Sequence, residues 1–284
     1  MFLNYQLNVS KFRLFSALNM HHIHKKTFFF NALQSTQDTA LELLQTQTIP
    51  AVLVIAEYQH KGRGQRENIW HAPLKSSVLC TLGLSGPLVT ALPVESLYWK
   101  IAVLTQSYLN ARYGLFDTPI RIKWPNDLYI NFKKLGGILI EITWLGNRMQ
   151  YVRMGLGLNV KGDFSTLQHS SAQLSDFITT PLEPTEIAEG WADYILQELF
   201  FPTLHLDELK SLYESALMGI NAWHEYHLHE VPKTLQITGI DDLGNLLLKS
   251  NTHQVLKPCT THLNGLGLLI KILDLLFLYI HKYI

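Results

Sequence analysis

The stretch from Ala56 to Trp70 holds the first residues whose types and spacing could do chemistry. It leaves an apolar run, AVLVIAEY, through the triplet Gly62-Arg63-Gly64 and then reaches the tryptophan. Backbone N–H groups freed by glycines can converge on an anion, and Arg63 and Arg66 add charge-assisted donors. The stretch therefore predicts a site for phosphate or carboxylate oxygens, although Gly-Arg-Gly alone is also typical of a plain surface turn.

Three further segments combine polar residues with small or rigid ones. RIKWPNDLY presents Asn126 and Asp127 after Pro125 ends a strand, KKLGGILIE begins at Lys133 and places Lys134 before two glycines, and GLGLN ends in Asn159. Each segment also has an ordinary structural explanation, namely a capped turn, a solvated lysine and tight strand packing. Together the three segments supply an amide, a carboxylate, an ammonium group and space left free by glycines. These are the components of a site that binds anions.

The elements around these segments predict an α+β fold. Apolar patterns indicate strands at 51–58 and 77–84, a helix at 94–113 closed by Gly114, and a hairpin that turns at Gly146-Asn147. Ser35 is expected to cap a helix, with Asp38 completing a capping box. Strands joined by short turns predict a mixed, largely antiparallel sheet, and the interspersed helices are expected to cover one face of it.

The pattern changes beyond residue 220, which predicts a domain boundary. Short strands joined by a turn at Asp242-Leu243-Gly244 indicate a small β domain over residues 221–265. We expect residues 27–220 to form the main domain, residues 1–26 to be a variable extension and residues 266–284 to be an apolar tail. The tail is too short and too interrupted by charge for a membrane span, so we expect an amphipathic helix packed within the chain.

Composition limits the classes of function. The chain has 284 residues, 47% of them hydrophobic, and a formal net charge of zero. A balanced charge argues against a broad electrostatic grip on nucleic acid or on a membrane surface. Cys80 and Cys259 have no metal-ligand spacing and are too few for a disulfide framework, which favours a reducing, cytoplasmic location.

The order of the motifs resembles that of the biotin protein ligases. The motifs are STQD, AEYQ followed by GRG and W, KWPNDLY, KLGGILIE and GLGLN, and the resemblance runs from about Phe28 to Val160. It implies a class II synthetase-like catalytic domain followed by a small SH3-like β-barrel. It also implies that the chain uses biotin, ATP and Mg²⁺, without a tightly bound prosthetic group. Biotinyl-5'-AMP would form first, and biotin would then pass to a lysine of the biotin carboxyl-carrier protein of acetyl-CoA carboxylase or a related carboxylase.

The resemblance also implies a role for each motif residue. The catalytic residues would be Lys134, which bridges the biotin carboxylate and the α-phosphate, Arg63 in the loop over the ligands, and Asp127, which binds magnesium or orients the acceptor amine. Biotin would be bound by Ser35, Thr36, Gln37, Gln59, Arg63, Gly64, Gln65 and Lys134. ATP would be bound by Gly62, Arg66, Trp70, Lys123, Asn126 and Asn159.

Two departures from the family pattern keep alternatives open. Gln65 and Glu67 alter the loop, and the apolar tail replaces the polar strand that normally ends the small barrel. A catalytically impaired biotin-binding protein is therefore one alternative, and a lipoate or octanoate ligase of the same fold is another. Only 34 residues precede Ser35, fewer than a winged helix-turn-helix domain needs, so we expect no DNA binding. A homodimer that forms through an exposed sheet edge remains open.

Overall fold

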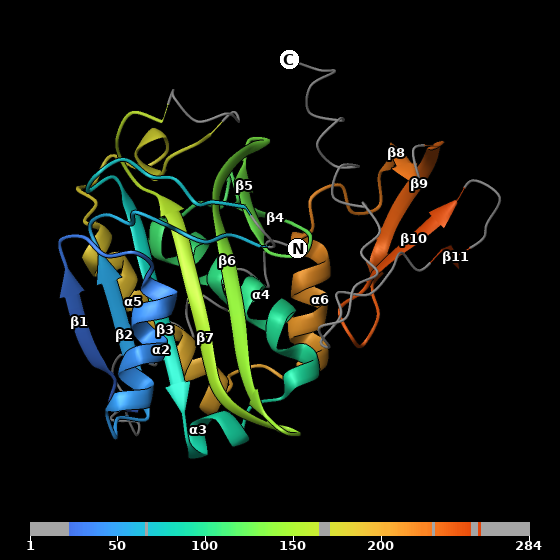
Figure 1. Cartoon of the computed structure of the whole chain (residues 1–284). Helices are drawn as coiled ribbons and strands as arrows, with labels where there is room; N and C mark the ends of the chain where they lie inside the picture. Colours follow the sequence, from blue (N-terminus) through green and yellow to red (C-terminus); the bar gives the residue numbers. More distant parts are fainter. Residues whose placement is uncertain (1–22, 66–67, 165–170, 229–230, 251–254, 257–284) are drawn as a thin grey trace.

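The computed structural model describes residues 23–65, 68–164, 171–228, 231–250 and 255–256. Most of the N-terminal extension, Arg66, Glu67 and the whole apolar tail expected at 266–284 lie outside the described residues. A seven-stranded sheet with helices on both faces forms the main body, and a four-stranded sheet follows it (Figure 1). Within the described ranges, no helix has the length and apolar composition that a membrane crossing requires.

The large sheet has the strand order β1-β2-β3-β7-β6-β5-β4. Its strands are β1 (Lys26–Phe30), β2 (Ala51–Ala56), β3 (Ser77–Ser85), β4 (Arg121–Lys123), β5 (Asp127–Ile130), β6 (Lys133–Leu145) and β7 (Arg148–Asn159). Strands β1 and β2 pair in parallel, whereas the other neighbouring strands pair antiparallel. The prediction of a mixed, largely antiparallel sheet is confirmed.

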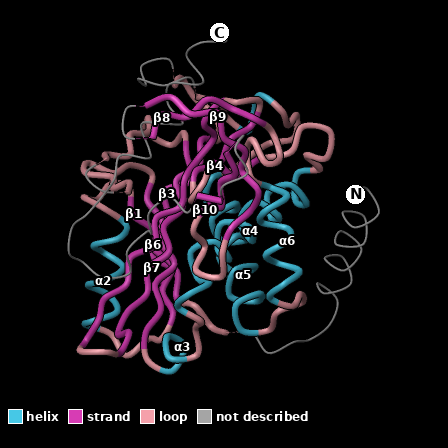
Figure 2. The backbone as a smooth tube through the Cα atoms, turned by 90° about the vertical axis from the view of Figure 1, so that its right-hand side faces the viewer, coloured by secondary structure: helices cyan, strands magenta, loops and turns pink. Residues whose placement is uncertain are grey.

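Helices lie on both faces of this sheet (Figure 2). On one side are α4 (Val94–Tyr113), α5 (Pro184–Phe200) and α6 (Leu206–Ala216), and on the other is α2 (Thr36–Thr46). Short helical turns, α3 (Pro87–Thr90) and a 3₁₀ turn (Leu174–Asp176), complete the helical structure that the described residues form. The expectation that the helices cover one face is wrong for α2.

The burial of β2 explains why α2 lies apart from the other helices. Leu53 and Ile55 belong to the large core, while Val52 and Val54 pack with Ala40 and Leu44 of α2 in a separate cluster. A strand that is apolar on both faces needs cover on both faces. We call the sheet face on which α2 packs the site face.

The helix ends follow the sequence signals, with one exception. Helix α4 ends at Tyr113, and Gly114 follows in the left-handed conformation with a φ of 65°. Ser35 caps α2, because its Oγ accepts a hydrogen bond from Gln37 N at 3.3 Å. The expected capping box is not formed, since the Asp38 carboxylate pairs instead with Arg63, at 2.9 Å from Nη2.

A second, C-terminal sheet lies in the region where the sequence predicts a small β domain, and the domain boundaries stay a prediction. It contains β8 (Trp223–Leu228), β9 (Val231–Ile240), β10 (Leu246–Ser250) and β11 (Val255–Leu256) in the order β11-β10-β9-β8, with antiparallel pairing. The described residues form an open four-stranded arrangement, so the closed SH3-like barrel stays a prediction.

Two hydrogen bonds fix the segment between β4 and β5. Trp124 Nε1 donates to the carbonyl oxygen of Gly244, in the β9–β10 turn, at 2.9 Å. Tyr213 of α6 donates through its hydroxyl to the carbonyl oxygen of Pro125 at 3.0 Å. Hydrogen bonds to both α6 and the C-terminal sheet therefore fix the position of the KWPND motif.

Gly244→Ala is expected to destabilise the protein more than the control Gly146→Ala. Both glycines have positive φ angles, 81° and 58°, so an added Cβ strains either backbone by about 1–2 kcal/mol. A Cβ at Gly244 would also lie 2.8 Å from Trp99 Cδ1, whereas one at Gly146 meets no atom within 4 Å. Urea unfolding should show an extra loss of roughly 1–3 kcal/mol for Gly244→Ala. Equal losses would mean that the β9–β10 turn does not rest on Trp99.

Candidate active site

A hydrogen-bonded group surrounds the N-terminal end of α2. Gln59 Oε1 accepts hydrogen bonds from Thr36 N at 2.7 Å and from Thr36 Oγ1 at 3.1 Å. Thr81 Oγ1 on β3 donates to Thr36 Oγ1 at 2.8 Å. The structure thus brings Ser35, Thr36, Gln37 and Gln59 together as the sequence predicts, and adds Thr81. The signal for Thr81 was its polar side chain on the site face of an otherwise apolar strand.

Gln37 extends from α2 over the pairing of β6 and β7. Its Nε2 donates to the Leu139 carbonyl oxygen at 3.0 Å, and a Cβ on Gly155 would lie only 2.5 Å from this nitrogen. The space left by Gly155 therefore holds the end of Gln37. The Oε1 of Gln37 is buried without a hydrogen-bond partner among the described residues, which leaves an acceptor that a ligand N–H can satisfy.

The glycine loop, which runs from Gly62 to Trp70 between β2 and β3, is closed by two main-chain hydrogen bonds. Gly64 N donates to Asn68 O at 2.8 Å, and Trp70 N donates to Gly62 O at 2.9 Å. A Cβ on Gly62 would lie 2.4 Å from Trp70 O, so a larger residue does not fit there. The Gly64 N–H, expected to contact an anion, is used inside the loop. Arg66, expected to contact ATP, lies outside the described residues.

Trp70 connects the end of the loop to the sheet. A Cβ on Gly157 would lie 2.6 Å from Trp70 Cε2, so the indole ring occupies the space that this glycine leaves free. The ring also lies 5.7 Å from Lys134 Nζ, which is within cation–π range. The Trp70 Nε1 group is buried and has no hydrogen-bond partner in the described part of the chain.

Charged residues gather where β4, β5 and β6 meet. Lys134 Nζ lies 2.9 Å from Asp127 Oδ2, and the two side chains are 28% and 27% exposed. Lys123 is buried beside them; burial lowers its pKa, the Asp127 carboxylate opposes this shift, and the Lys134 ammonium adds to it. Two ammonium groups against one carboxylate leave positive charge on the site face, which suits phosphate oxygens.

The two asparagines that the sequence assigns to a nucleotide also anchor the main chain. Asn126 Nδ2 donates to the carbonyl oxygen of Ile138, and Asn159 Nδ2 donates to that of Ala172 at 3.0 Å. Asn159 Oδ1 is buried without a partner among the described residues. Nucleotide contact by these amides stays a prediction.

Arg63 is held by two carboxylates on the site face. Its Nη2 lies 2.8 Å from Glu141 Oε2 and 2.9 Å from Asp38 Oδ1. Glu141 Oε2 in turn lies 3.0 Å from Arg153 Nη1. Sequence reasoning selected neither Glu141 nor Arg153. Strand alternation was the available signal, because it places residue 153 on the same face as Gly155 and Gly157.

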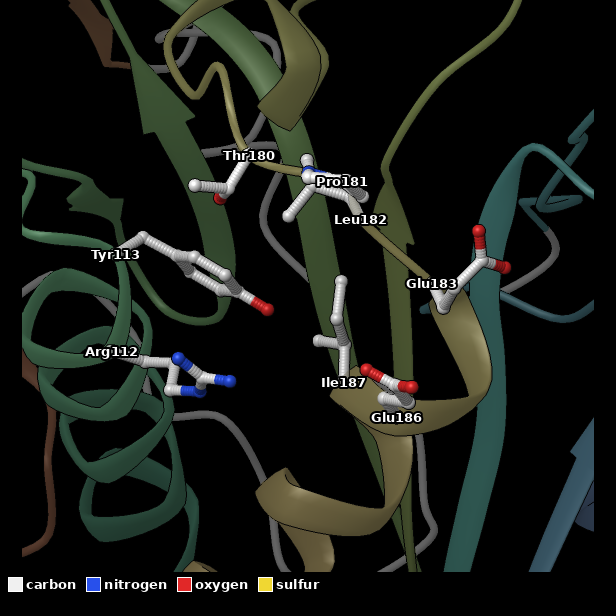
Figure 3. A pocket seen from close by; sticks show the side chains of 8 residues that line it. All are labelled: Arg112, Tyr113, Thr180, Pro181, Leu182, Glu183, Glu186 and Ile187. Carbon is white, nitrogen blue, oxygen red and sulfur yellow. The ribbon is translucent and has the colours of Figure 1, made fainter.

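A separate small cavity lies between the C-terminal end of α4 and the N-terminal end of α5 (Figure 3). Its volume of about 60 Å³ has room for a few water molecules, far less than a metabolite needs. The lining residues are Arg112, Tyr113, Thr180, Pro181, Leu182, Glu183, Glu186 and Ile187. None of them belongs to the motifs, so we assign this cavity no role in the chemistry.

Comparison with known proteins agrees with the motifs and with this geometry. The model of the biotin/lipoate A/B protein ligase family matches residues 29–159. The bifunctional ligase/repressor BirA of Bacillus subtilis is 29% identical over 230 residues, which cover 78% of this chain and 69% of that protein. The biotin--[acetyl-CoA-carboxylase] ligase of Mycobacterium tuberculosis is 31% identical over 115 residues, 39% of this chain and 40% of that protein.

A solved structure supports the fold. The biotin protein ligase from Aquifex aeolicus in complex with biotin and ATP superposes with a TM-score of 0.66 at 19% identity, covering 82% of this chain and 96% of that chain. The fold and the site define a protein of the biotin and lipoate ligase class. Within that class, the chain is similar to biotin protein ligases: residues 29–159 match the family model, and the curated relatives and the solved structure are ligases of this kind.

Gly157→Ala is expected to push the Trp70 ring off the sheet. The added Cβ meets the rigid indole, and overpacking of this kind costs roughly 1–3 kcal/mol. Gly155→Ala is the matched control, because its Cβ meets the flexible end of Gln37 and should cost less stability. Urea unfolding measures the loss of stability in both variants. Hydrogen exchange at the main-chain N–H of Trp70 should be faster in Gly157→Ala alone. Equal exchange rates at this N–H in the two variants would mean that the space at Gly157 does not determine the position of the Trp70 ring.

Proposed function

We propose that the chain is a biotin protein ligase, which forms biotinyl-5'-AMP from biotin and ATP and transfers biotin to a lysine of a carrier protein. One observation carries the proposal: a single sheet face holds an uncharged hydrogen-bonding group at one end and a positively charged group at the other. The first group, around Thr36 and Gln59, suits the ureido ring of biotin. The second, around Lys134 and Lys123, suits its carboxylate and the phosphates.

In the first step, a carboxylate oxygen of biotin attacks the α-phosphorus of ATP. A P–O bond to the carboxylate forms, the bond to the β-phosphate oxygen breaks, and pyrophosphate leaves. Two anions must approach each other, so the reaction needs positive charge that is already in place. Lys134 is the residue for this task, because its ammonium group lies at the charged end of the site and can follow the charge as it shifts.

Magnesium fits the site through Asp127. The described residues contain no cluster of three or more acidic, histidine or cysteine side chains, but Mg²⁺ with a nucleotide needs only one or two carboxylates and the phosphates. One carboxylate oxygen of Asp127, Oδ2, accepts a hydrogen bond from Lys134 Nζ. The other oxygen, Oδ1, lies beside Gly137, 3.0 Å from the position that a Cβ on this glycine would take. Asp127 would hold the ion, which would neutralise phosphate charge when bound.

In the second step, an acceptor lysine attacks the acyl carbon of the adenylate, an amide bond forms and AMP leaves. The mixed anhydride must be kept from water until the amine arrives. The glycine loop with Arg63 is the part of this chain for that role. The relative from Mycobacterium tuberculosis is named for acetyl-CoA carboxylase, which supports a biotin carboxyl-carrier protein as the acceptor. We place the reaction in the cytoplasm, because two cysteines without a disulfide or metal-ligand pattern favour a reducing compartment.

Isotope exchange between ATP and pyrophosphate tests the proposed function. Exchange that requires biotin is the expected result, because adenylation is reversible on the enzyme. Biotin binding without exchange would indicate the impaired biotin-binding protein. Exchange supported by lipoate or octanoate instead of biotin would indicate the other ligase of this fold.

Lys134→Ala is expected to slow adenylation by about a hundredfold or more, the scale of losing one preorganised charge-stabilising group. Biotin affinity should fall much less, because the ammonium group acts mainly as charge develops. Lys133→Ala is the matched control, since Lys133 is the exposed neighbour on β6. Single-turnover formation of biotinyl-AMP and calorimetric biotin binding measure the two effects. A normal adenylation rate in Lys134→Ala would remove this lysine from the mechanism.

A further inference from the structure

Arg153 is a buried arginine in the middle of β7, and its neighbours Val152 and Met154 to Leu158 are apolar residues and glycines. It lies on β7, in the sequence YVRMGLGLN, and only 7% of its surface is exposed. Burial lowers the pKa of its guanidinium, and the Glu141 carboxylate opposes this shift. Because an arginine stays charged in proteins, the chain bears the cost of a buried cation at this position.

The contacts of Arg153 join two parts of the site. In the strand register Arg153 lies directly opposite Glu141 of β6, with Nη1 at 3.0 Å from Oε2. The same Nη1 donates to the main-chain carbonyl oxygen of Gln37 at 3.2 Å. Arg153 therefore holds a carboxylate on the sheet and the first turn of α2, where Thr36 and Gln37 form the uncharged end of the site.

Glu141 connects Arg153 to the glycine loop through an ion pair with Arg63. The Oε2 atom that Arg153 contacts is also 2.8 Å from Arg63 Nη2. One carboxylate oxygen is thus shared by a buried arginine, which cannot move far, and a loop arginine that is 39% exposed. Asp38 Oδ1 lies 2.9 Å from the same Nη2 atom, so this nitrogen of Arg63 contacts two carboxylates.

We propose that Arg153 is a positioning residue for the glycine loop: it fixes Glu141, and through Glu141 it fixes Arg63. A buried methionine at this position would fill the same space without the cost of a buried charge. What methionine lacks is the planar set of donors that can hold Glu141 and the Gln37 carbonyl at the same time. The role of the loop in retaining biotin rests on the proposed function; the mechanical coupling from Arg153 to the loop does not.

Arg153→Met tests the coupling in the ligand-free protein. Amide exchange at Gly64 and Trp70, whose N–H groups close the loop, should become about tenfold faster, as expected when a charge-assisted anchor is lost. Arg148→Met is the matched control, because Arg148 is an exposed arginine on the same strand. In this variant, exchange at the Gly64 and Trp70 amides should match the wild type. The biotin dissociation constant of Arg153→Met, measured by calorimetry, should also rise about tenfold.

Glu141→Gln is the second variant, because it keeps the shape of the side chain and removes the shared charge. It should accelerate exchange at the same two amides, and it decides the question if Arg153→Met does not fold. Loop exchange at the wild-type rate in a folded Arg153→Met protein, or in Glu141→Gln, would overturn the proposal and leave Arg153 a purely structural ion pair. If the wild-type chain does not bind biotin, the proposed function fails, but the exchange result still tests the coupling.

Discussion

The register between β6 and β7 determines what can stand on the site face. It sets Gly137 opposite Gly157, Leu139 opposite Gly155 and Glu141 opposite Arg153. The glycines leave the space that Trp70 and Gln37 fill, and the last pair is a cross-strand ion pair. Because side chains alternate along a strand, a slip of one residue would turn these groups into the core and bring Leu156 and Leu158 to the site face.

The parts of the fold that could be predicted are those whose information is local. Helix α4 carries its own end signal in Gly114, and the β6–β7 hairpin carries its own turn at Gly146. The parallel pairing of β1 with β2, and the place of α2, depend instead on which residues meet across the sheet. Six consecutive buried residues in β2 say that both faces are covered, but they do not say by what.

The same distinction applies to the site. The resemblance of the motifs to those of the biotin protein ligases predicted the residues around Thr36 and the Lys134–Asp127 group, because each motif carries several of these residues close together in sequence. The partners that hold these residues in place, Thr81, Glu141 and Arg153, are single polar residues whose immediate neighbours in the strand are mostly apolar. A lone polar residue in a strand is informative only when its neighbours across the sheet are known, so it takes a register to identify them.

The support of the charged end comes from outside the motifs as well. Strands β4 and β5 contain three and four residues, so their own ladder gives the segment from Lys123 to Asp127 few hydrogen bonds. The contacts of Trp124 with Gly244 and of Pro125 with Tyr213 add two more, from the C-terminal sheet and α6. Preorganised charge is effective only while it is held in position. The C-terminal sheet therefore helps to position Lys123 and Asp127, on which the proposed chemistry depends, although it supplies none of the motif residues.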